Sequence, residues 1–206
     1  FQTAYMKTYH PVEYMAALLT YEMGSTDKVV EYIEECRRMS IRVLPPDVNY
    51  SDKDFTPIYL QKEEPARKKG AAKRRGAEEA KARPLEGVIR FGMMAVRGIG
   101  EKPVEAILKE RAAKGPFKSL FDFCERVDLR VVTRSTVEAL IKCGAFSSLG
   151  ARRAQLLNIL EKAFELGQQA QEDRRMGQFS MFGSSLEGSA SAPRLDPPLP
   201  DVEELE

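Results

Sequence analysis

Residues 97–103 combine two glycines, basic side chains and a proline in a spacing suited to binding a phosphate group. Gly98 and Gly100 flank one aliphatic residue, and glycine adopts the positive-φ conformations that a tight reversal between helices requires. Pro103 fits the first turn of a following helix, where its missing N–H removes no hydrogen bond. Such a helix directs unpaired N–H groups and the positive end of its dipole toward the glycines. The pattern therefore predicts an anion-binding bend.

Basic side chains lie on both sides of this bend, and contacts to phosphate hold a protein on DNA without reading its bases. Apolar helical sequence precedes the bend at residues 91–96 and follows it at residues 103–111. The stretch resembles a helix-hairpin-helix motif, which binds the DNA backbone without sequence specificity. The predicted DNA-binding residues are Arg97, Gly98, Ile99, Gly100 and Lys102.

The same residues could also form a simple connector between helices or a dinucleotide-binding loop. A Gly-x-Gly sequence between helices also occurs as a simple tight connector. The basic flanks and Pro103 favour phosphate binding over that alternative. A dinucleotide-binding fingerprint is disfavoured, because no third glycine follows at the required spacing and no parallel-sheet pattern surrounds the stretch.

The composition favours a mainly α fold of one large domain or two small ones. The chain has 206 residues, of which 43% are hydrophobic, 31% charged and 8% aromatic, as is typical of many short amphipathic helices. The formal net charge is only +1, so any contact with nucleic acid must come from local basic patches.

The cysteine and histidine content argues against several classes of site. Cys36, Cys124 and Cys143 are isolated in apolar helical sequence and are predicted to be reduced core residues of a cytoplasmic protein. His10 is the only histidine, which disfavours a His/Cys metal cluster or a Ser-His-Asp triad. We predict no membrane-spanning segment and no signal peptide. Because the sequence opens in mid-pattern at Phe1, we expect a piece of a longer protein.

Residues 1–90 are predicted to form one region of helical bundle pieces and short strands. Helices are expected on both sides of His10-Pro11 and over 28–39, and a short strand over 41–44. Residues 55–60 and 87–91 are expected to pair as a small β-hairpin. Between them, residues 61–84 are a low-complexity stretch with nine basic and four acidic residues. This disordered basic loop is either a solvated insertion or a nonspecific DNA tether.

Residues 91–175 are predicted to hold a tandem helix-hairpin-helix unit. After the bend at 97–103, helices are expected over 119–127, 134–143 and 151–175, the last with a broad apolar stripe. Gly144-Ala145-Phe146 is predicted to form a second glycine-containing hairpin. Two such hairpins on one surface would span neighbouring phosphates.

Residues 176–206 are rich in Gly, Ser and Pro and are predicted to be a disordered C-terminal tail. Met181 and Phe182 have no predicted core in which to be buried. They are either a chance apolar pair or anchors that dock on a partner, with the amide of Gln178 supplying orientation.

Six stretches of the chain together resemble the alpha subunits of bacterial DNA polymerase III, the C-family of replicative polymerases. They follow the order of that family and are residues 1–7 with 10–18, 28–32 with 35–39, 44–49, 91–101, 119–124 and 140–146. The resemblance implies that residues 1–90 are a distal part of the fingers and that residues 91–175 hold the duplex behind the active site. It also implies that Gln178, Met181 and Phe182 dock on the beta sliding clamp.

The resemblance implies a parent that is a nucleotidyltransferase using Mg²⁺, with primer–template DNA, the beta clamp and other replicase subunits as partners. In this family the palm carboxylates that bind the catalytic metals lie upstream, so we expect no catalytic residue, metal ligand or cofactor in this chain. The insertion at 61–84 is longer than the usual turn of the family, and its role is open. The alternatives are a stand-alone DNA-repair-type helix-hairpin-helix enzyme and a purely structural interaction module.

Overall fold

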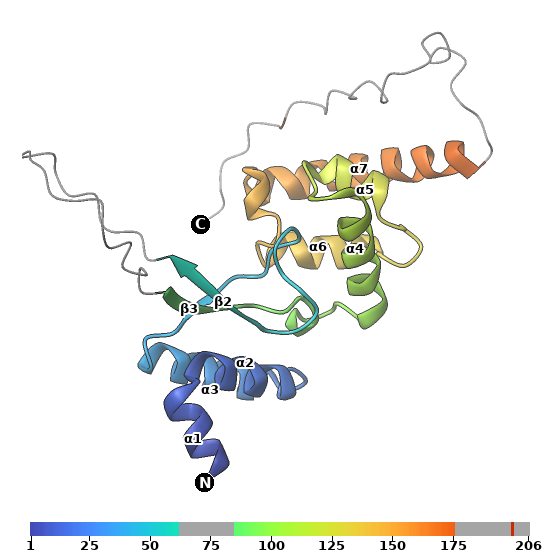
Figure 1. Cartoon of the computed structure of the whole chain (residues 1–206). Helices are drawn as coiled ribbons and strands as arrows, with labels where there is room; N and C mark the ends of the chain where they lie inside the picture. The colour runs from blue at the N-terminus through green and yellow to red at the C-terminus, as the bar shows by residue number, and fades with distance from the viewer. Residues whose placement is uncertain (62–84, 176–198, 200–206) are drawn as a thin grey trace, which may run out of the picture. The chain divides into compact units, whose positions relative to one another are not determined.

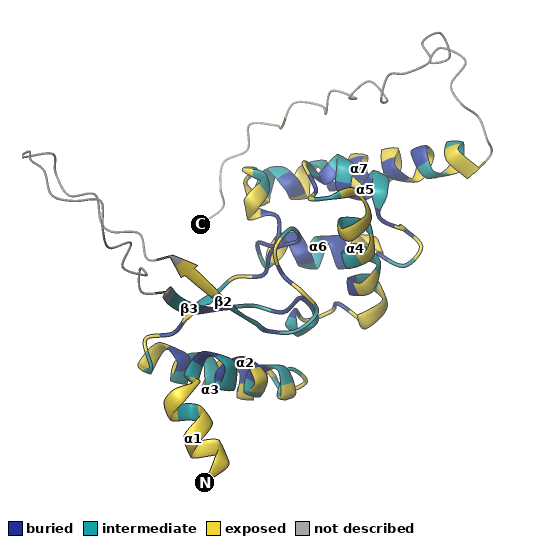
Figure 2. Ribbon diagram, in the orientation of Figure 1, coloured by how far each residue is buried: buried dark blue, intermediate teal, exposed yellow. Residues whose placement is uncertain are grey.

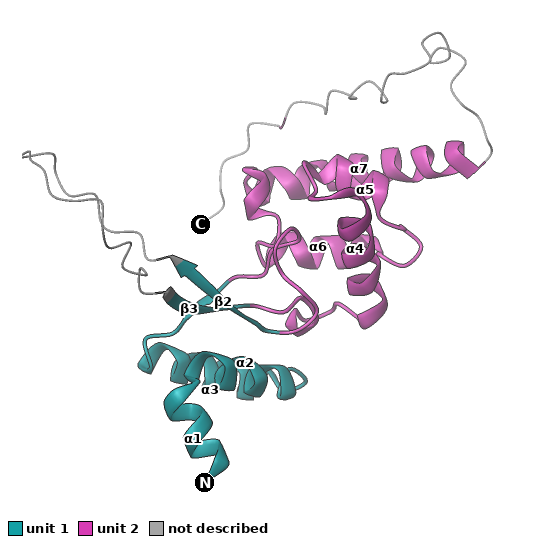
Figure 3. Ribbon diagram, viewed as in Figure 1, with its two compact units in different colours: residues 1–44, 55–90 teal, residues 45–54, 91–206 magenta. Residues whose placement is uncertain are grey.

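The computed structural model describes residues 1–61, 85–175 and 199, which form two compact units (Figures 1 and 3). Of the described residues, the first unit contains 1–44, 55–61 and 85–90, and the second contains 45–54 and 91–175. The described parts are mainly helical, with one small sheet, which confirms the predicted fold class. Of the predicted basic loop at 61–84, Gln61 is the last residue of a strand, and residues 62–84 and most of the predicted tail lie outside the described residues.

The first unit contains the small sheet and three helices, which are α1 (Gln2–Tyr9), α2 (Pro11–Tyr21) and α3 (Thr26–Arg38). The predicted break at His10-Pro11 is confirmed, because Pro11 is the first residue of α2. Helix α2 buries one apolar face, whereas α1 buries no residue (Figure 2). Helix α3 ends in a turn at Ser40, where φ is 60° and the Ile41 N–H donates to the Cys36 carbonyl at 2.8 Å.

The sheet has the strand order β1-β3-β2, with β1 at Arg42–Leu44, β2 at Thr56–Gln61 and β3 at Leu85–Arg90. Strands β2 and β3 are antiparallel with Ile58 opposite Val88, which confirms the predicted hairpin. The sequence did not predict that β1 pairs with β3 in parallel, with Val43 opposite Ile89. Val88 and Ile89 are both fully buried, as is typical of a central strand covered on both faces.

In the second unit, helices surround a continuous apolar core. The elements are the 3₁₀ turn η1 (Met93–Ala95), α4 (Glu101–Lys114), α5 (Leu120–Arg126), α6 (Arg134–Lys142), the 3₁₀ turn η2 (Ser147–Leu149) and α7 (Arg153–Arg175). The Phe123 ring meets the edge of Phe117 at 4.9 Å and of Phe146 at 5.0 Å between centroids. Ser119 and Thr133 cap α5 and α6 by accepting backbone N–H groups through their hydroxyls.

Helices α5 and α7 approach each other closely at Gly167. A Cβ added there would lie 2.6 Å from the Cys124 carbonyl oxygen, so only glycine fits without displacement. One turn later, the Gln171 side-chain amide donates to the carbonyls of Cys124 at 3.0 Å and Val127 at 2.8 Å. Gln171 thereby satisfies carbonyls at the end of α5 that have no partner within that helix.

Residues 45–54 leave the sheet and belong to the helical unit. Val48 lies fully buried in the helical core. The Asn49 side chain pairs with the Phe117 backbone, accepting its N–H at 2.8 Å and donating to its carbonyl at 3.0 Å. The buried Asp47 accepts the Ser148 hydroxyl at 3.0 Å, and the Ser51 hydroxyl donates to the Phe91 carbonyl at 2.8 Å. The first unit is therefore discontinuous in sequence, whereas we predicted one continuous region over 1–90.

The three cysteines are free thiols, with Cys36 and Cys124 buried and Cys143 partly buried. Burial raises the pKa of Cys36 to about 11 and that of Cys124 to about 12. Both thiols are therefore protonated near neutral pH, in agreement with the prediction of reduced core residues. Among the helices of the described ranges, none is long and apolar enough to cross a membrane.

Candidate nucleic-acid interface

The predicted bend is an exposed turn whose flanking apolar side chains are buried. Gly98 has φ 86°, a conformation that disfavours residues with a Cβ. The N–H groups of Val96 and Ile99 each donate at 3.2 Å, to the carbonyls of Met93 and Val96 respectively. The side chains of Val96 and Ile99 are only 9% and 8% exposed, so they fix the turn to the core. Gly98 and Gly100 remain on the outside.

The backbone amides of the bend differ in their availability to a ligand. The Ile99 N–H donates to the Val96 carbonyl inside the turn and the Ile99 side chain is buried, so Ile99 anchors the bend to the core. Within the described part of the chain, no acceptor meets the amides of Gly98, Gly100, Glu101 or Lys102. A Cβ at Gly98 would meet no atom within 4 Å, and one at Gly100 would meet only Pro103 Cδ at 3.8 Å. The bend is therefore open to a large ligand.

Helix α4 presents its N-terminus at the bend. Gly100 is its N-cap, and no side chain caps the helix there. Pro103 is the third residue of α4, within the first turn, where its missing N–H removes no intrahelical bond. The exposed Arg97 and Lys102 make no ion pair with any described residue. Free amides, the helix dipole and two available cations together form a site suited to an anion.

The sequence before the bend forms less helix than predicted. Residues 91–96 were expected to be helical, but only the 3₁₀ turn η1 forms there. The N–H groups of Met93 and Met94 are not available for helical hydrogen bonds, because they donate to the carbonyls of Asp52 at 2.9 Å and Lys53 at 3.1 Å. Gly92 permits this approach, since a Cβ there would lie 2.6 Å from the Asp54 carbonyl carbon.

The second predicted hairpin is not open at the expected residues. Gly144 has φ 81° at the end of α6, but a Cβ there would lie 2.8 Å from a guanidinium nitrogen of Arg153. Ala145 and Phe146 are fully buried. The glycine-containing turn predicted at the end of α6 is therefore present, but Arg153 and the core cover Gly144, Ala145 and Phe146, so this segment cannot be the second open phosphate-binding bend.

An open bend occurs six residues later and repeats the geometry of the first. Gly150 has φ 75°, and a Cβ there would meet no atom within 4 Å. Gly150 precedes the first residue of α7, Arg153, by three positions, as Gly98 precedes Glu101 of α4. The Leu156 N–H donates to the Arg152 carbonyl at 3.0 Å, as Val104 does to Gly100 at 3.4 Å. The signal in the sequence was a glycine followed by the basic pair Arg152-Arg153.

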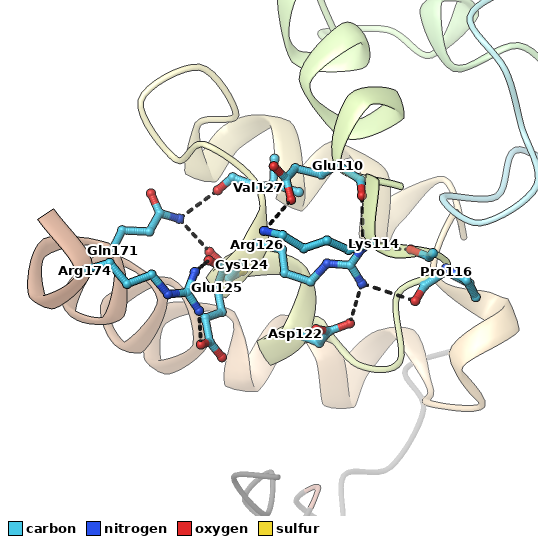
Figure 4. Close-up of polar contacts among 11 residues, drawn as sticks. Glu110, Lys114, Pro116, Asp122, Cys124, Glu125, Arg126, Val127, Gln171 and Arg174 are labelled. Atoms are coloured by element: carbon cyan, nitrogen blue, oxygen red, sulfur yellow. Dashed lines mark hydrogen bonds and ion pairs between the residues drawn. The ribbon is translucent and has the colours of Figure 1, made fainter. Parts of the chain in front are cut away.

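The far end of α4 is fixed by a side chain that sequence analysis did not single out (Figure 4). The Arg126 guanidinium donates to the carbonyls of Glu110 at 3.1 Å, Gly115 at 2.7 Å and Pro116 at 3.2 Å. It also pairs with Asp122 at 3.1 Å and lies 4.5 Å above the Phe117 ring centre. Arg126 therefore holds the C-terminus of α4 against α5, which fixes the direction of the helix that carries the bend.

The predicted clamp-binding residues Gln178, Met181 and Phe182 lie outside the described residues. Within residues 1–61 and 85–175, no group of three or more His, Cys, Asp or Glu side chains is placed to hold a metal ion.

Comparison with known proteins identifies both a family and a set of close relatives. Residues 40–156 match the helix-hairpin-helix motif family. DNA polymerase III subunit alpha of Pasteurella multocida is 39% identical over 183 residues, and that of Haemophilus influenzae is 40% identical over 183 residues. Each alignment covers 89% of this chain and 14% of the relative. The Deinococcus radiodurans subunit is 42% identical over 165 residues, or 80% of this chain and 10% of that protein.

The chain thus spans about one-seventh of the length of most of these relatives. The resemblance to the alpha subunits of bacterial DNA polymerase III is confirmed over most of its residues. The family match includes both open bends, at Gly98 and at Gly150. The chain belongs to the helix-hairpin-helix motif family, and most of its length is similar to part of bacterial DNA polymerase III alpha subunits.

Proposed function

We propose that this chain holds duplex DNA by its phosphate backbone, as part of a replicative DNA polymerase. The observation that carries the proposal is the open bend before α4, with amides that have no acceptor in the described chain and two cations that have no acidic partner there. Phosphate contacts of this kind position a protein on DNA without selecting a sequence. The names of the relatives, which are DNA polymerase III alpha subunits, support the choice of DNA as the ligand.

In this proposal, the amides of Gly98, Gly100 and the first residues of α4 donate to phosphate oxygens, and Arg97 and Lys102 neutralise the charge. The bend at Gly150 supplies a second contact, with Arg152 and Arg153 beside it. Each neutralised phosphate releases counterions, so the affinity falls as the salt concentration rises. Duplex DNA would be gripped at two places on the same unit and would remain free to slide.

We further propose that the residues after α7 dock on the sliding clamp. Gln178, Met181 and Phe182 supply an amide and two apolar side chains, a combination suited to anchoring an extended peptide in pockets. Docking would raise the effective concentration of the polymerase at the primer terminus, so that a modest peptide affinity becomes processive synthesis. The whole protein would be a cytoplasmic DNA-directed DNA polymerase that uses Mg²⁺, with its catalytic carboxylates in other parts of the protein and further replicase subunits as partners.

Replacing both cations of the first bend tests DNA binding. Arg97→Ala/Lys102→Ala is expected to weaken binding to a fluorescent duplex by about tenfold or more at low salt, since each phosphate contact contributes to affinity. Fluorescence anisotropy measures the effect. Lys118→Ala is the control, because Lys118 is exposed and follows the opposite end of α4. Equal affinity of the double variant and the wild type would reject the proposal and favour a purely structural role of the hairpins.

Removing the apolar anchors tests clamp docking separately. Met181→Ala/Phe182→Ala is expected to abolish binding to the immobilised beta clamp and to leave duplex affinity within about twofold, because truncated anchor residues remove most of the energy of such contacts. Surface plasmon resonance measures the first quantity and anisotropy the second. Ser184→Ala/Ser185→Ala is the control in the same segment. Unchanged clamp affinity in the anchor variant would contradict the assignment.

A further inference from the structure

A carboxylate lies where the proposed site would meet phosphate. Glu101 is the first residue of α4 and follows Gly100 directly, and Glu105 lies one turn further along the same helix. The side chains of Glu101 and Glu105 are 56% and 60% exposed. An acid in the first turn stabilises a helix through its dipole, but two acids beside the bend repel a phosphate.

Lys53, from a distant part of the sequence, lies against both acids and offsets one of their two negative charges. Its ammonium hydrogen-bonds to Glu101 Oε1 and lies 3.9 Å from Glu105 Oε1. The hydrogen bond from Lys53 lowers the pKa of Glu101, and the same bond raises the pKa of Lys53. Both groups therefore stay charged at neutral pH, and the ammonium offsets part of the negative field at the mouth of the bend.

The backbone that carries Lys53 is held firmly beside the bend. Its carbonyl accepts the Met94 N–H at 3.1 Å, and the preceding Asp52 carbonyl accepts the Met93 N–H at 2.9 Å. Arg111, in the last turn of α4, donates to the Ser51 carbonyl at 2.6 Å and pairs with Asp52 at 2.8 Å. Residues 51–53 are therefore attached both to the turn before the bend and to the helix after it. The pair therefore joins two fixed segments of backbone, so that only the half-exposed side chains of Lys53, Glu101 and Glu105 have to be ordered.

We propose that Lys53 is a positioning residue of the DNA-binding bend, which offsets part of the negative charge of Glu101 and Glu105 so that a phosphate can approach the amides of Gly98 and Gly100. The proposal rests on the proposed function of this bend. In this role Lys53 acts through the two carboxylates and does not itself contact DNA. The charge balance at the bend thus depends on a residue 44 positions before Arg97 in the sequence.

A set of charge-removing variants of the whole chain tests this role. Lys53→Met keeps the apolar stem and is expected to weaken duplex binding by about three- to tenfold, because two carboxylates are left uncompensated near phosphate. Lys53→Arg, which keeps the charge, is expected to retain most of the affinity. Glu101→Gln/Glu105→Gln is expected to bind at least as tightly as the wild type. In that background, Lys53→Met is expected to change affinity by less than about twofold.

The outcomes distinguish charge compensation by Lys53 from a direct contact with DNA and from a purely structural role. An equal loss for Lys53→Met with and without the two glutamates would mean that Lys53 contacts DNA directly, which would overturn the proposal. A loss that follows a lowered melting temperature, and that Glu101→Gln/Glu105→Gln does not restore, would mean a structural role and would also overturn it. No loss for Lys53→Met, while Arg97→Ala/Lys102→Ala still weakens binding, would reject the role of Lys53 alone. If neither variant weakened binding, the proposed function itself would fail.

Discussion

At the scale of single residues, neighbouring positions of the bend have opposite tasks. Ile99 is buried and its amide is used internally, so it fixes the bend to the core. Gly98 and Gly100 face outward with space around them, so they leave room for a ligand. The sequence predicted the bend as one set of DNA-binding residues, because the Gly-Ile-Gly pattern does not show which amides are already hydrogen-bonded. In the structure, Ile99 is a buried anchor, whereas Gly98 and Gly100 form the exposed surface of the bend.

The positive φ of Gly98 gives a prediction at this scale. Gly98→Ala is expected to lower the free energy of unfolding by about 1–2 kcal/mol, because a Cβ is strained in the left-handed conformation even with open space around it. Gly100→Ala is the matched control in the same bend, since its φ of −87° suits any residue. Chemical denaturation measures both variants. Equal stabilities of the two would contradict the observed conformation of the bend.

At the scale of elements, α4 is held at both ends by side chains from outside it. Lys53 pairs with its first residue, and Arg126 binds the carbonyls of Glu110 and Gly115 at its other end. Within α4 itself, Arg111 reaches back to the carbonyl of Ser51. The direction of α4 sets where its N-terminal amides point, so these contacts fix the orientation of the amides at the bend.

The contact between α5 and α7 gives a prediction at the scale of elements. Gly167→Ala is expected to destabilise the protein by about 1–3 kcal/mol, because the added methyl group would overlap the backbone of Cys124. The sign of this stability change is informative, because a Gly-to-Ala exchange in a helix without a close neighbour would stabilise the helix by about 0.5–1 kcal/mol. Thermal unfolding measures the difference, and Gln168→Ala on the exposed side of α7 is the control. A stabilised Gly167→Ala variant would show that the helices are not in close contact there.

At the scale of the whole molecule, the sequence predicted where helices and strands occur better than it predicted which distant segments they contact. Local periodicity and capping residues predicted α6 after Thr133, α7 and the β2–β3 hairpin close to where they occur. The parallel pairing of β1 with β3 and the transfer of residues 45–54 to the helical unit depend on long-range contacts. No local pattern encodes the pairing of Asn49 with Phe117 or of Lys53 with Glu101.

The candidate site was predicted to a similar extent. The first bend was located correctly from its glycines, Pro103 and the basic flanks. The second was expected at Gly144, because a glycine after a helix was visible in the sequence but the covering side chain of Arg153 was not. The residues of the predicted clamp-binding segment lie outside the described part of the chain, and their role remains a proposal.

The salt dependence of DNA binding tests the central claim most directly. The logarithm of the association constant with a duplex should fall linearly with the logarithm of salt concentration, at about 0.9 per phosphate neutralised. Arg97→Ala/Lys102→Ala should reduce the magnitude of this slope by about 1.8, which corresponds to two lost phosphate contacts. The same slope should be found for duplexes of unrelated sequence. A slope near zero for the wild type, or one that the double variant leaves unchanged, would contradict the assignment of this bend to the DNA backbone.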